Sequence, residues 1–365
     1  MERMAKLRVE KQKIAYFSME IALSNEIHTY SGGLGVLAGD VVRSSVDLNI
    51  PLVGVTLASK KGYFRQELTH EGRQIEHPDP WNPSQFMKQL PEEVAVKIQG
   101  RDVRIKAWMY TLKSTSGWEV PVYFLDTDVD GNRPEDREIT SFLYGGDEKY
   151  RLKQEIVLGV GGVRMLERLD VIAHKYHMNE GHSSFLALEL LRKSEMNISK
   201  VRNLCIFTTH TPVEAAHDKF SYELVQETLG DFIPLNILKS LGGEDRLNMT
   251  LLALNLSNYV NGVAKRHRIV SREMFPSYEI HAITNGVHSY TWTCESFKTL
   301  YDKYLPGWAH EPELLMRIDV VPDDEIWRAH MAAKKLLIDY INKTTDVGMD
   351  YETLTIGFAR RATEY

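Results

Sequence analysis

Short apolar runs alternate with longer amphipathic segments along this chain of 365 residues. Residues 14–17 and 51–56 are apolar enough to form buried strands, and residues 36–48 between them have the pattern of a helix. This order predicts a βαβ unit with parallel strands and a right-handed crossover. The alternation returns later, with helices predicted at 150–169 and 183–193 and strands at 171–174, 204–207 and 280–283. We therefore expect an α/β protein with a doubly wound, Rossmann-like sheet.

Residues 60–135 interrupt this alternation. They contain six prolines and β-rich runs at 103–109 and 120–125, so we expect an antiparallel β insertion beside the main sheet. Asp126, Asp128 and Asp130 within this region imitate the start of a calcium-binding loop. Arg137 stands where such a loop needs its bidentate Glu, which argues against calcium and favours a surface turn.

Composition narrows the class of protein. The chain is 43% hydrophobic and 26% charged, as is usual for a globular enzyme, and its net charge of -6 argues against a nucleic-acid surface. Two cysteines cannot build a disulfide framework, and residues 1–13 are too charged for a signal peptide. Because no apolar run reaches about 18 residues, we expect no membrane span, and the two cysteines fit a reducing cytoplasm.

Three glycines, Gly32, Gly33 and Gly35, lie between the first predicted strand and the first predicted helix. Free N–H groups at a helix N-terminus favour an anion such as phosphate. The loop lacks the Lys of a P-loop, and it fits a dinucleotide fingerprint only with Ala38 in the last position. A tight turn without a ligand stays as the alternative interpretation.

Polar side chains follow several predicted strands at their C-terminal ends. Glu20 follows the first strand, His177 to His182 follow the strand at 171–174, and His210 follows the strand at 204–207. Since ligands gather at this edge of a doubly wound sheet, one cleft lined with Glu, His and Asn is expected. The spacing of these histidines matches no zinc pattern, so we expect no metal and favour groups that bind sugar hydroxyls.

Several motifs resemble, in order, those of the α-glucan (glycogen, starch, maltodextrin) phosphorylases, most of all the short bacterial and archaeal branch. The segments that carry the resemblance are Ser31–Gly35, Leu143–Asp147, Arg151–Glu155, His177–His182, Thr208–Pro212, Asn261–Ala264 and Thr284–Val287. The resemblance implies transfer of a terminal α-1,4-linked glucosyl unit to inorganic phosphate, which gives glucose 1-phosphate. It also implies the two-domain GT-B fold and pyridoxal phosphate, whose phosphate group assists proton transfer.

Roles for individual residues come from the resemblance. His210 would be the catalytic residue that contacts the glucosyl unit. The residues that would face the phosphates of substrate and cofactor are Gly32, Gly33, Leu34 and Glu20. Those that would bind sugar are Asn179, Glu180, His182 and Asp147, with Gly146 and Asp147 in a loop that gates the cleft. Read without the resemblance, Arg151–Glu155 fits a charged helix face equally well.

The resemblance also predicts an incomplete enzyme. Residues 1–345 would be the N-terminal GT-B domain, joined through a helical connection at 323–342, and residues 346–365 would begin the second domain. The lysine that holds pyridoxal phosphate belongs to that second domain, so we expect the chain alone to lack phosphorolysis. The expected partners are α-1,4-glucan, phosphate, the missing C-terminal domain and a second copy in a homodimer.

Two alternatives stay open. Glycogen and starch synthases share the GT-B fold and a Gly-Gly-Leu-Gly loop, but they typically carry a Lys just before the glycines. Here Tyr30 and Ser31 occupy those positions. The other alternative is a non-catalytic half that only binds glucan.

Overall fold

The computed structural model describes residues 13–114, 116–211, 213 and 217–358, and these divide into two compact units. The first unit is Met1–Gly286 and the second is Val287–Tyr365. Each is described by itself below. The predicted domain boundary after residue 345 concerns the fold of the complete enzyme and stays a prediction.

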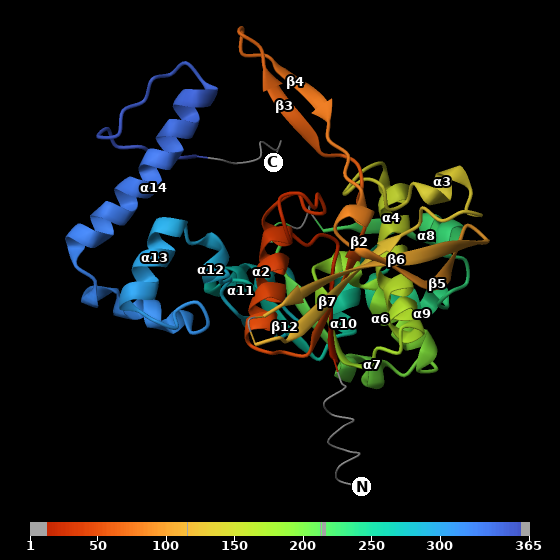
Figure 1. Ribbon diagram of the computed structural model, residues 1–365. Helices are drawn as coiled ribbons and strands as arrows, with labels where there is room; N and C mark the ends of the chain where they lie inside the picture. The colour runs from red at the N-terminus through yellow and green to blue at the C-terminus, as the bar shows by residue number, and fades with distance from the viewer. Residues whose placement is uncertain (1–12, 115, 212, 214–216, 359–365) are drawn as a thin grey trace. The chain divides into compact units, whose positions relative to one another are not determined.

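A mixed sheet forms the centre of the first unit (Figure 1). Its strand order is β13-β12-β9-β8-β1-β2-β7-β6-β5. The strands are β1 (Lys13–Ser18), β2 (Leu52–Leu57), β5 (Lys88–Ile98), β6 (Arg101–Lys113), β7 (Glu119–Asp126), β8 (Ala173–Asn179), β9 (Cys205–Thr209), β12 (Tyr259–Gly262) and β13 (His281–Ala282).

Strand direction and order together locate a switch point. Every pairing from β13 across to β7 is parallel, whereas β6 is antiparallel to both β7 and β5. The chain builds outward from β1 through β2 to β7, then returns to the other side of β1 to add β8, β9, β12 and β13. In doubly wound sheets, ligands bind outside the carboxyl ends of the strands at such a reversal. The reversal here lies between β1 and β8.

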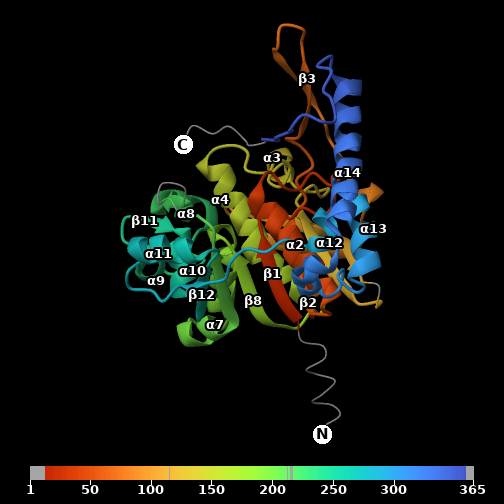
Figure 2. The same ribbon diagram turned by 90° about the vertical axis from the view of Figure 1, so that its left-hand side faces the viewer.

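Apolar side chains project from both faces of the sheet and pack in a core on each side, as a doubly wound fold requires. Tyr16 of β1 packs in a core with Val42 and Val46 of α2 (Gly33–Asp47). Its neighbours Ala15 and Phe17 belong to a second core on the opposite face. That core includes α4 (Glu148–Ile156), α5 (Gly162–Arg168) and α6 (Phe185–Lys193). Figure 2 shows α2 lying over β1. The predicted doubly wound, Rossmann-like class is confirmed.

Several element boundaries differ from the prediction. The helix predicted at 150–169 is α4 and α5 joined by a π-helical turn, Val157–Gly161. The strand predicted at 171–174 begins at Ala173 and continues to Asn179. His177 and Asn179 therefore lie within β8, where the sequence pattern had placed them after the strand. Parallel pairing with both β1 and β9 explains the longer strand.

The region 60–135 contains two kinds of β structure. Strands β5, β6 and β7 extend the main sheet, and β3 (Phe64–Leu68) and β4 (Gln74–Pro78) form a separate hairpin. That this region is an insertion relative to the family fold stays a prediction.

The surface-turn interpretation is wrong for Asp126, which is fully buried and 3.3 Å from the Lys60 ammonium. Arg137 pairs with Asp128, so these carboxylates serve an ion-pair network.

Shorter elements complete the first unit. They are the helices α3 (Pro134–Arg137), α7 (Ile198–Leu204), α8 (Tyr222–Leu229), α9 (Leu235–Gly242), α10 (Met249–Asn255) and α11 (Lys265–Met274), the antiparallel strands β10 (Lys219–Ser221) and β11 (Arg246–Asn248), and 3-10 turns at Pro83–Gln85 and Gly181–Ser183.

The second unit is helical in its described part. It contains α12 (Ser289–Trp292), α13 (Glu295–Tyr304), a 3-10 segment at Pro312–Val320 and α14 (Asp323–Thr344). Leu300, Val321 and Ala329 form its small core. The helix predicted at 323–342 is confirmed as α14, and its role as a connection between two domains stays a prediction. In the segment expected to begin a second domain, residues 354–358 are irregular and 359–365 lie outside the described residues. None of the described helices combines the length and apolarity needed to cross a membrane.

Candidate functional site

Three strand ends meet at the switch point between β1 and β8. The Asn179 side chain at the end of β8 donates from Nδ2 to Ser18 Oγ at the end of β1, over 3.0 Å. Its Oδ1 lies 2.6 Å from Nε2 of His210, which follows β9. Because an amide oxygen only accepts, His210 Nε2 carries the proton. The structure thus brings His210 and Asn179 together, as the sequence predicted.

Glu180 anchors the backbone around His210. Its Oε2 accepts from the His210 N–H at 2.8 Å and from the Thr211 hydroxyl at 2.9 Å, and Oε1 accepts from the Gly181 N–H at 2.9 Å. Burial raises the pKa of the Glu180 carboxyl, but His210, His182 and these N–H groups outweigh it and the pKa is lowered. The backbone of Glu180 has φ 72°, a conformation that costs a non-glycine residue about 1–3 kcal/mol. Its contact with sugar stays a prediction.

Glu20 connects the glycine loop with the loop before α4. Its Oε2 accepts from the N–H of Ser31 at 2.6 Å and of Gly32 at 3.2 Å. Its Oε1 accepts from the Tyr144 hydroxyl at 2.7 Å. Glu20 is buried, so this carboxylate fixes the position of both loops at the edge of the cleft.

The N-terminus of α2 is open beside Glu20. Helix α2 begins at Gly33 with no side-chain cap and no acidic residue in its first turn. Within the described part of the chain, the N–H groups of Gly33 and Leu34 make no hydrogen bond. A Cβ built on Gly32 or Gly33 meets no atom within 4 Å. An anion such as phosphate therefore fits this helix end, and the chemical identity of that phosphate stays a prediction.

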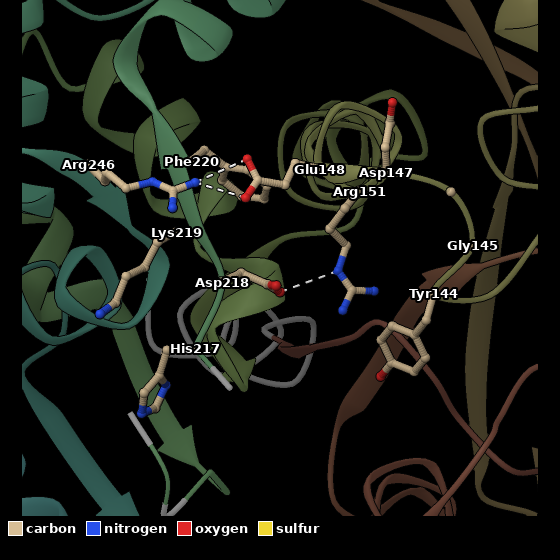
Figure 3. A pocket seen from close by; sticks show the side chains of 11 residues that line it. Tyr144, Gly145, Asp147, Glu148, Arg151, His217, Asp218, Lys219, Phe220 and Arg246 are labelled. Atoms are coloured by element: carbon tan, nitrogen blue, oxygen red, sulfur yellow. Dashed lines mark hydrogen bonds and ion pairs between the residues drawn. The ribbon is translucent and has the colours of Figure 1, made fainter. Parts of the chain in front are cut away.

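Tyr144 also lines a polar cavity of about 390 Å³ (Figure 3). Its lining residues are Tyr144, Gly145, Gly146, Asp147, Glu148, Arg151, His217, Asp218, Lys219, Phe220 and Arg246. The Arg151 guanidinium carbon lies 4.3 Å from the Tyr144 ring centre, and its Nε lies 3.3 Å from Asp218 Oδ2. Arg246 pairs with Glu148 at 2.9 Å. The cavity thus offers alternating cationic and anionic groups beside an aromatic ring.

His182 is tied to this cavity through Asp218. Its Nε2 lies 3.3 Å from Asp218 Oδ2, and its ring centre lies 5.6 Å from that of Tyr144. Burial, reinforced by the Arg151 charge, lowers the pKa of His182 to about 4. The imidazole is therefore neutral, and Nε2–H donates to the carboxylate. Burial raises the pKa of Asp218, but His182 and Arg151 outweigh it, so the pKa is lowered and Asp218 is an anion.

Asp147 has a structural role in the described conformation. Its Oδ1 accepts from the Tyr150 N–H at 2.8 Å and caps the N-terminus of α4. Figure 3 shows its side chain pointing away from Arg151 and Asp218. A sugar-binding or gating role for Asp147 stays a prediction.

A smaller cavity of about 170 Å³ continues along the strand ends. His177, Asn179, Thr208 and Asn261 line it, together with Asn285. Thr208 donates to Asn261 Oδ1 over 3.0 Å and lies 2.8 Å from His177 Nε2. Because Thr208 donates its hydroxyl proton to Asn261, its oxygen can only accept from His177, and His177 Nε2–H is the donor.

The sequence analysis gave no role to several of these residues. Asp218, Lys219 and Arg246 come from β10, β11 and the residues beside them. The only signal was a polar cluster, His217 to Lys219, soon after the Thr208–Pro212 motif. Arg151–Glu155 is not an exposed charged face, because Leu152, Gln154 and Glu155 are fully buried. Among the described residues, no three His, Cys, Asp or Glu side chains are placed to hold a metal ion.

Comparisons with known proteins identify sequences similar to this chain. Residues 4–139 match the family model of the carbohydrate phosphorylases. The chain is 37% identical to the maltodextrin phosphorylase of Thermococcus litoralis, over 97% of this chain and 47% of that protein. It is 34% identical to the glycogen phosphorylase of Aquifex aeolicus, over 97% of this chain and 58% of that protein. For the glycogen phosphorylase of Mycobacterium tuberculosis the identity is 32%, over 96% and 47%.

Each comparison covers a larger share of this chain than of the relative. Nearly the whole chain is matched, and it spans about half the length of the curated relatives that it matches. The matched region therefore extends over the glycine loop, the strand ends and the cavity described above. The chain is therefore similar to carbohydrate phosphorylases, through residues 4–139 in the family model and over nearly its whole length in these relatives.

Proposed function

We propose that this chain is the glucan-facing part of an α-glucan phosphorylase, which moves a terminal α-1,4-linked glucosyl unit onto inorganic phosphate. The observation that carries the proposal is the arrangement at the switch point. His210 is held there by Asn179 and Glu180, and the open N-terminus of α2 belongs to the same strand edge. Sugar-binding and phosphate-binding groups are thus available at one edge of the sheet. The product would be glucose 1-phosphate.

His210 is suited to a sugar hydroxyl. Burial lowers the pKa of His210 more than the neighbouring Glu180 raises it, so the imidazole is neutral. With Nε2–H bonded to Asn179, its Nδ1 presents a lone pair that accepts a hydrogen bond. The Glu180 carboxylate accepts from the His210 N–H and from the Thr211 hydroxyl, which fixes the backbone that carries the ring. His210 would thus orient the glucosyl unit.

The cavity of about 390 Å³ fits the rest of a glucan chain. A glucosyl unit is a neutral polyol whose hydroxyls both donate and accept hydrogen bonds. Arg151 and Asp218 provide a donor and an acceptor at the cavity wall, and Tyr144 provides an aromatic surface. Fixed polar groups in a concave, partly apolar site are typical of small-molecule binding. We propose that α-1,4-linked units occupy this cavity.

The start of α2 would hold phosphate. The N–H groups of Gly33 and Leu34 would donate to anionic oxygens, helped by the helix dipole. A phosphate dianion there would stabilise the positive charge that develops at the anomeric carbon. Pyridoxal phosphate, the cofactor implied for the family, would supply a phosphate group that assists proton transfer. The proposal includes the GT-B arrangement, a homodimer and a cytoplasmic location.

Binding measurements on the chain test the proposal. Isothermal titration calorimetry should detect maltoheptaose but neither cellohexaose, with β-1,4 links, nor UDP-glucose, the donor type of the synthase alternative. His210→Ala should weaken maltoheptaose binding by roughly tenfold or more, as expected for loss of a buried polar contact. His70→Ala, on the exposed hairpin turn, is the matched control and should bind like the wild type. Equal affinity for the two oligosaccharides, or binding of UDP-glucose alone, would overturn the proposal.

A further inference from the structure

Glu155 is a buried carboxyl group that the chemistry above does not use. It lies on α4 one turn after Arg151, and its exposed fraction is 0%. Neither of its carboxyl oxygens accepts a hydrogen bond from a nitrogen or hydroxyl donor of the described residues. A buried carboxylate normally gathers several donors, because an unpaired buried charge is very costly. Glu155 therefore needs another explanation for its burial.

Among the described residues, the ion pairs of Glu155 and Asp218 share one permanent cation, Arg151. Arg151 Nε lies 3.7 Å from Glu155 Oε1 but 3.3 Å from Asp218 Oδ2. Asp218 also receives Nε2–H of His182 at 3.3 Å, and it shares the Arg151 Nε with Glu155. Glu180 adds a further negative charge nearby. Two adjacent carboxylates in such a place cannot both ionise easily, and the one with fewer donors retains its proton.

Glu189 shows what an ionised buried carboxyl requires in this fold. It is 1% exposed, and its oxygens lie 2.9 Å from both Arg164 Nε and Arg192 Nη2. Burial raises the pKa of Glu189, but the two arginines outweigh it and the pKa is lowered. For Glu155, burial raises the pKa and the Asp218 charge adds to it, which puts the pKa well above its ordinary value. The two buried carboxyls are thus in opposite states.

We propose that Glu155 is a positioning residue that remains a neutral carboxylic acid and donates its O–H to Asp218. Asp218 is then fixed where it can hold the Arg151 guanidinium and the His182 Nε2–H at the wall of the polar cavity. Ionised Glu155 would compete with Asp218 for Arg151 and draw the guanidinium away from the cavity. The ligand of that cavity rests on the proposed function, whereas the protonation state of Glu155 does not.

Infrared difference spectroscopy tests the protonation state directly. At neutral pH, the spectrum of the wild type minus Glu155→Gln should contain the carbonyl stretch of a protonated carboxylic acid. The spectrum of the wild type minus Glu189→Gln, the matched control, should lack it. Absence of the band in the Glu155→Gln difference would overturn the proposal, whatever sugar the protein binds.

The pH dependence of unfolding gives a second readout. A carboxyl whose folded-state pKa is raised stabilises the fold at low pH and loses that contribution as the pH rises above about 4.3, the unfolded value. The wild type should therefore lose stability relative to Glu155→Gln as the pH rises. For Glu189→Gln the sign reverses, and the wild type should gain. The same sign for both variants would contradict the assignment.

Ligand binding tests the positioning role. Gln at position 155 can still donate to Asp218, whereas Leu has a similar size but no donor. Glu155→Leu should weaken maltoheptaose binding by roughly tenfold, the effect of about one lost polar contact, and Glu155→Gln should bind at least several-fold more tightly than Glu155→Leu. Equal binding by both variants would exclude positioning. If the wild type also fails to bind maltoheptaose, the proposed function fails, and the infrared result still decides the state of Glu155.

Discussion

Gly33 and Gly35 stand two positions apart in the glycine loop and have opposite surroundings. A Cβ on Gly35 would lie 2.6 Å from Tyr30 Cβ and 2.7 Å from Glu20 Oε2, closer than packed atoms allow. A Cβ on Gly33 would meet nothing within 4 Å. Gly35 is thus needed by the protein itself, because the Glu20 carboxylate packs against its backbone. Gly33 faces open space, which the proposed phosphate could occupy.

Alanine substitutions at these two positions should separate folding from binding. Gly35→Ala should lower the free energy of unfolding by about 1–3 kcal/mol, because the new methyl group overpacks against Glu20 and Tyr30. Gly33→Ala should change that free energy by less than about 1 kcal/mol, since Ala is well tolerated in a helix. Its methyl group would instead obstruct phosphate, so glucose 1-phosphate binding should weaken. Urea unfolding and titration calorimetry measure the two effects, and similar stability losses in both variants would refute this distinction.

At the scale of elements, the π-helical turn between α4 and α5 shows how closely the helical layer is packed. Gly159 lies in this turn, where a Cβ would come within 2.4 Å of the Leu186 backbone nitrogen and 2.7 Å of the Phe185 carbonyl carbon. Those atoms belong to the backbone of α6 and cannot move aside separately. A Cβ on Gly161 would instead meet the end of the Ile105 side chain at 2.6 Å. A side-chain end can change rotamer, so the two glycines differ in tolerance.

Gly159→Ala should therefore be much more harmful than Gly161→Ala. We expect Gly159→Ala to lower the free energy of unfolding by about 3 kcal/mol or more, because α6 must shift as a whole. Gly161→Ala should cost about 1 kcal/mol, since Ile105 can repack. Both substitutions place the same methyl group in the same turn, so helix propensity cancels in the comparison. Equal losses in urea unfolding would show that α6 is more loosely held than the structure indicates.

The helical layer also shows where sequence patterns are informative. The pattern of residues 150–169 predicted a helical segment, which the structure has, but not its division into α4 and α5. The π-helical turn between them leaves no signal in that pattern because all of its residues are buried. Strand β8 was predicted too early and too short, since its end at Asn179 depends on pairing with β1 and β9. Local pattern thus predicted the elements, and tertiary pairing determined their limits.

At the scale of the whole molecule, the strand order explains why part of the site could be predicted. Parallel strands bring their carboxyl ends to one edge, so His210, Asn179 and Glu20 could be grouped from sequence. Asp218 and Arg246 do not follow a strand of that sheet. They reach the cavity through the β10–β11 pair, which sequence periodicity did not indicate. Their contribution required the three-dimensional structure.

Stability should depend on pH because several histidines are buried in neutral form. Burial, then His210, lowers the pKa of His177 to about 4, and burial, then Arg151, lowers the pKa of His182 to about 4. Burial also lowers the pKa of His210 and His267. The unfolded chain takes up these protons below about pH 6.5, before the folded protein can. Such groups stabilise the fold above that pH and lose this contribution as the pH falls toward 4.

We therefore expect the free energy of unfolding to fall by about 2 kcal/mol or more between about pH 7 and pH 5. Glu155 acts with the opposite sign, because its raised pKa makes the folded state bind the extra proton, but it is one group against several histidines. His177→Asn should make the fall smaller, since it removes one of those protons, and Glu155→Gln should make it steeper. Urea unfolding at each pH measures all three slopes. A free energy of unfolding that stays constant or rises toward pH 5 would mean that these histidines are not buried in neutral form.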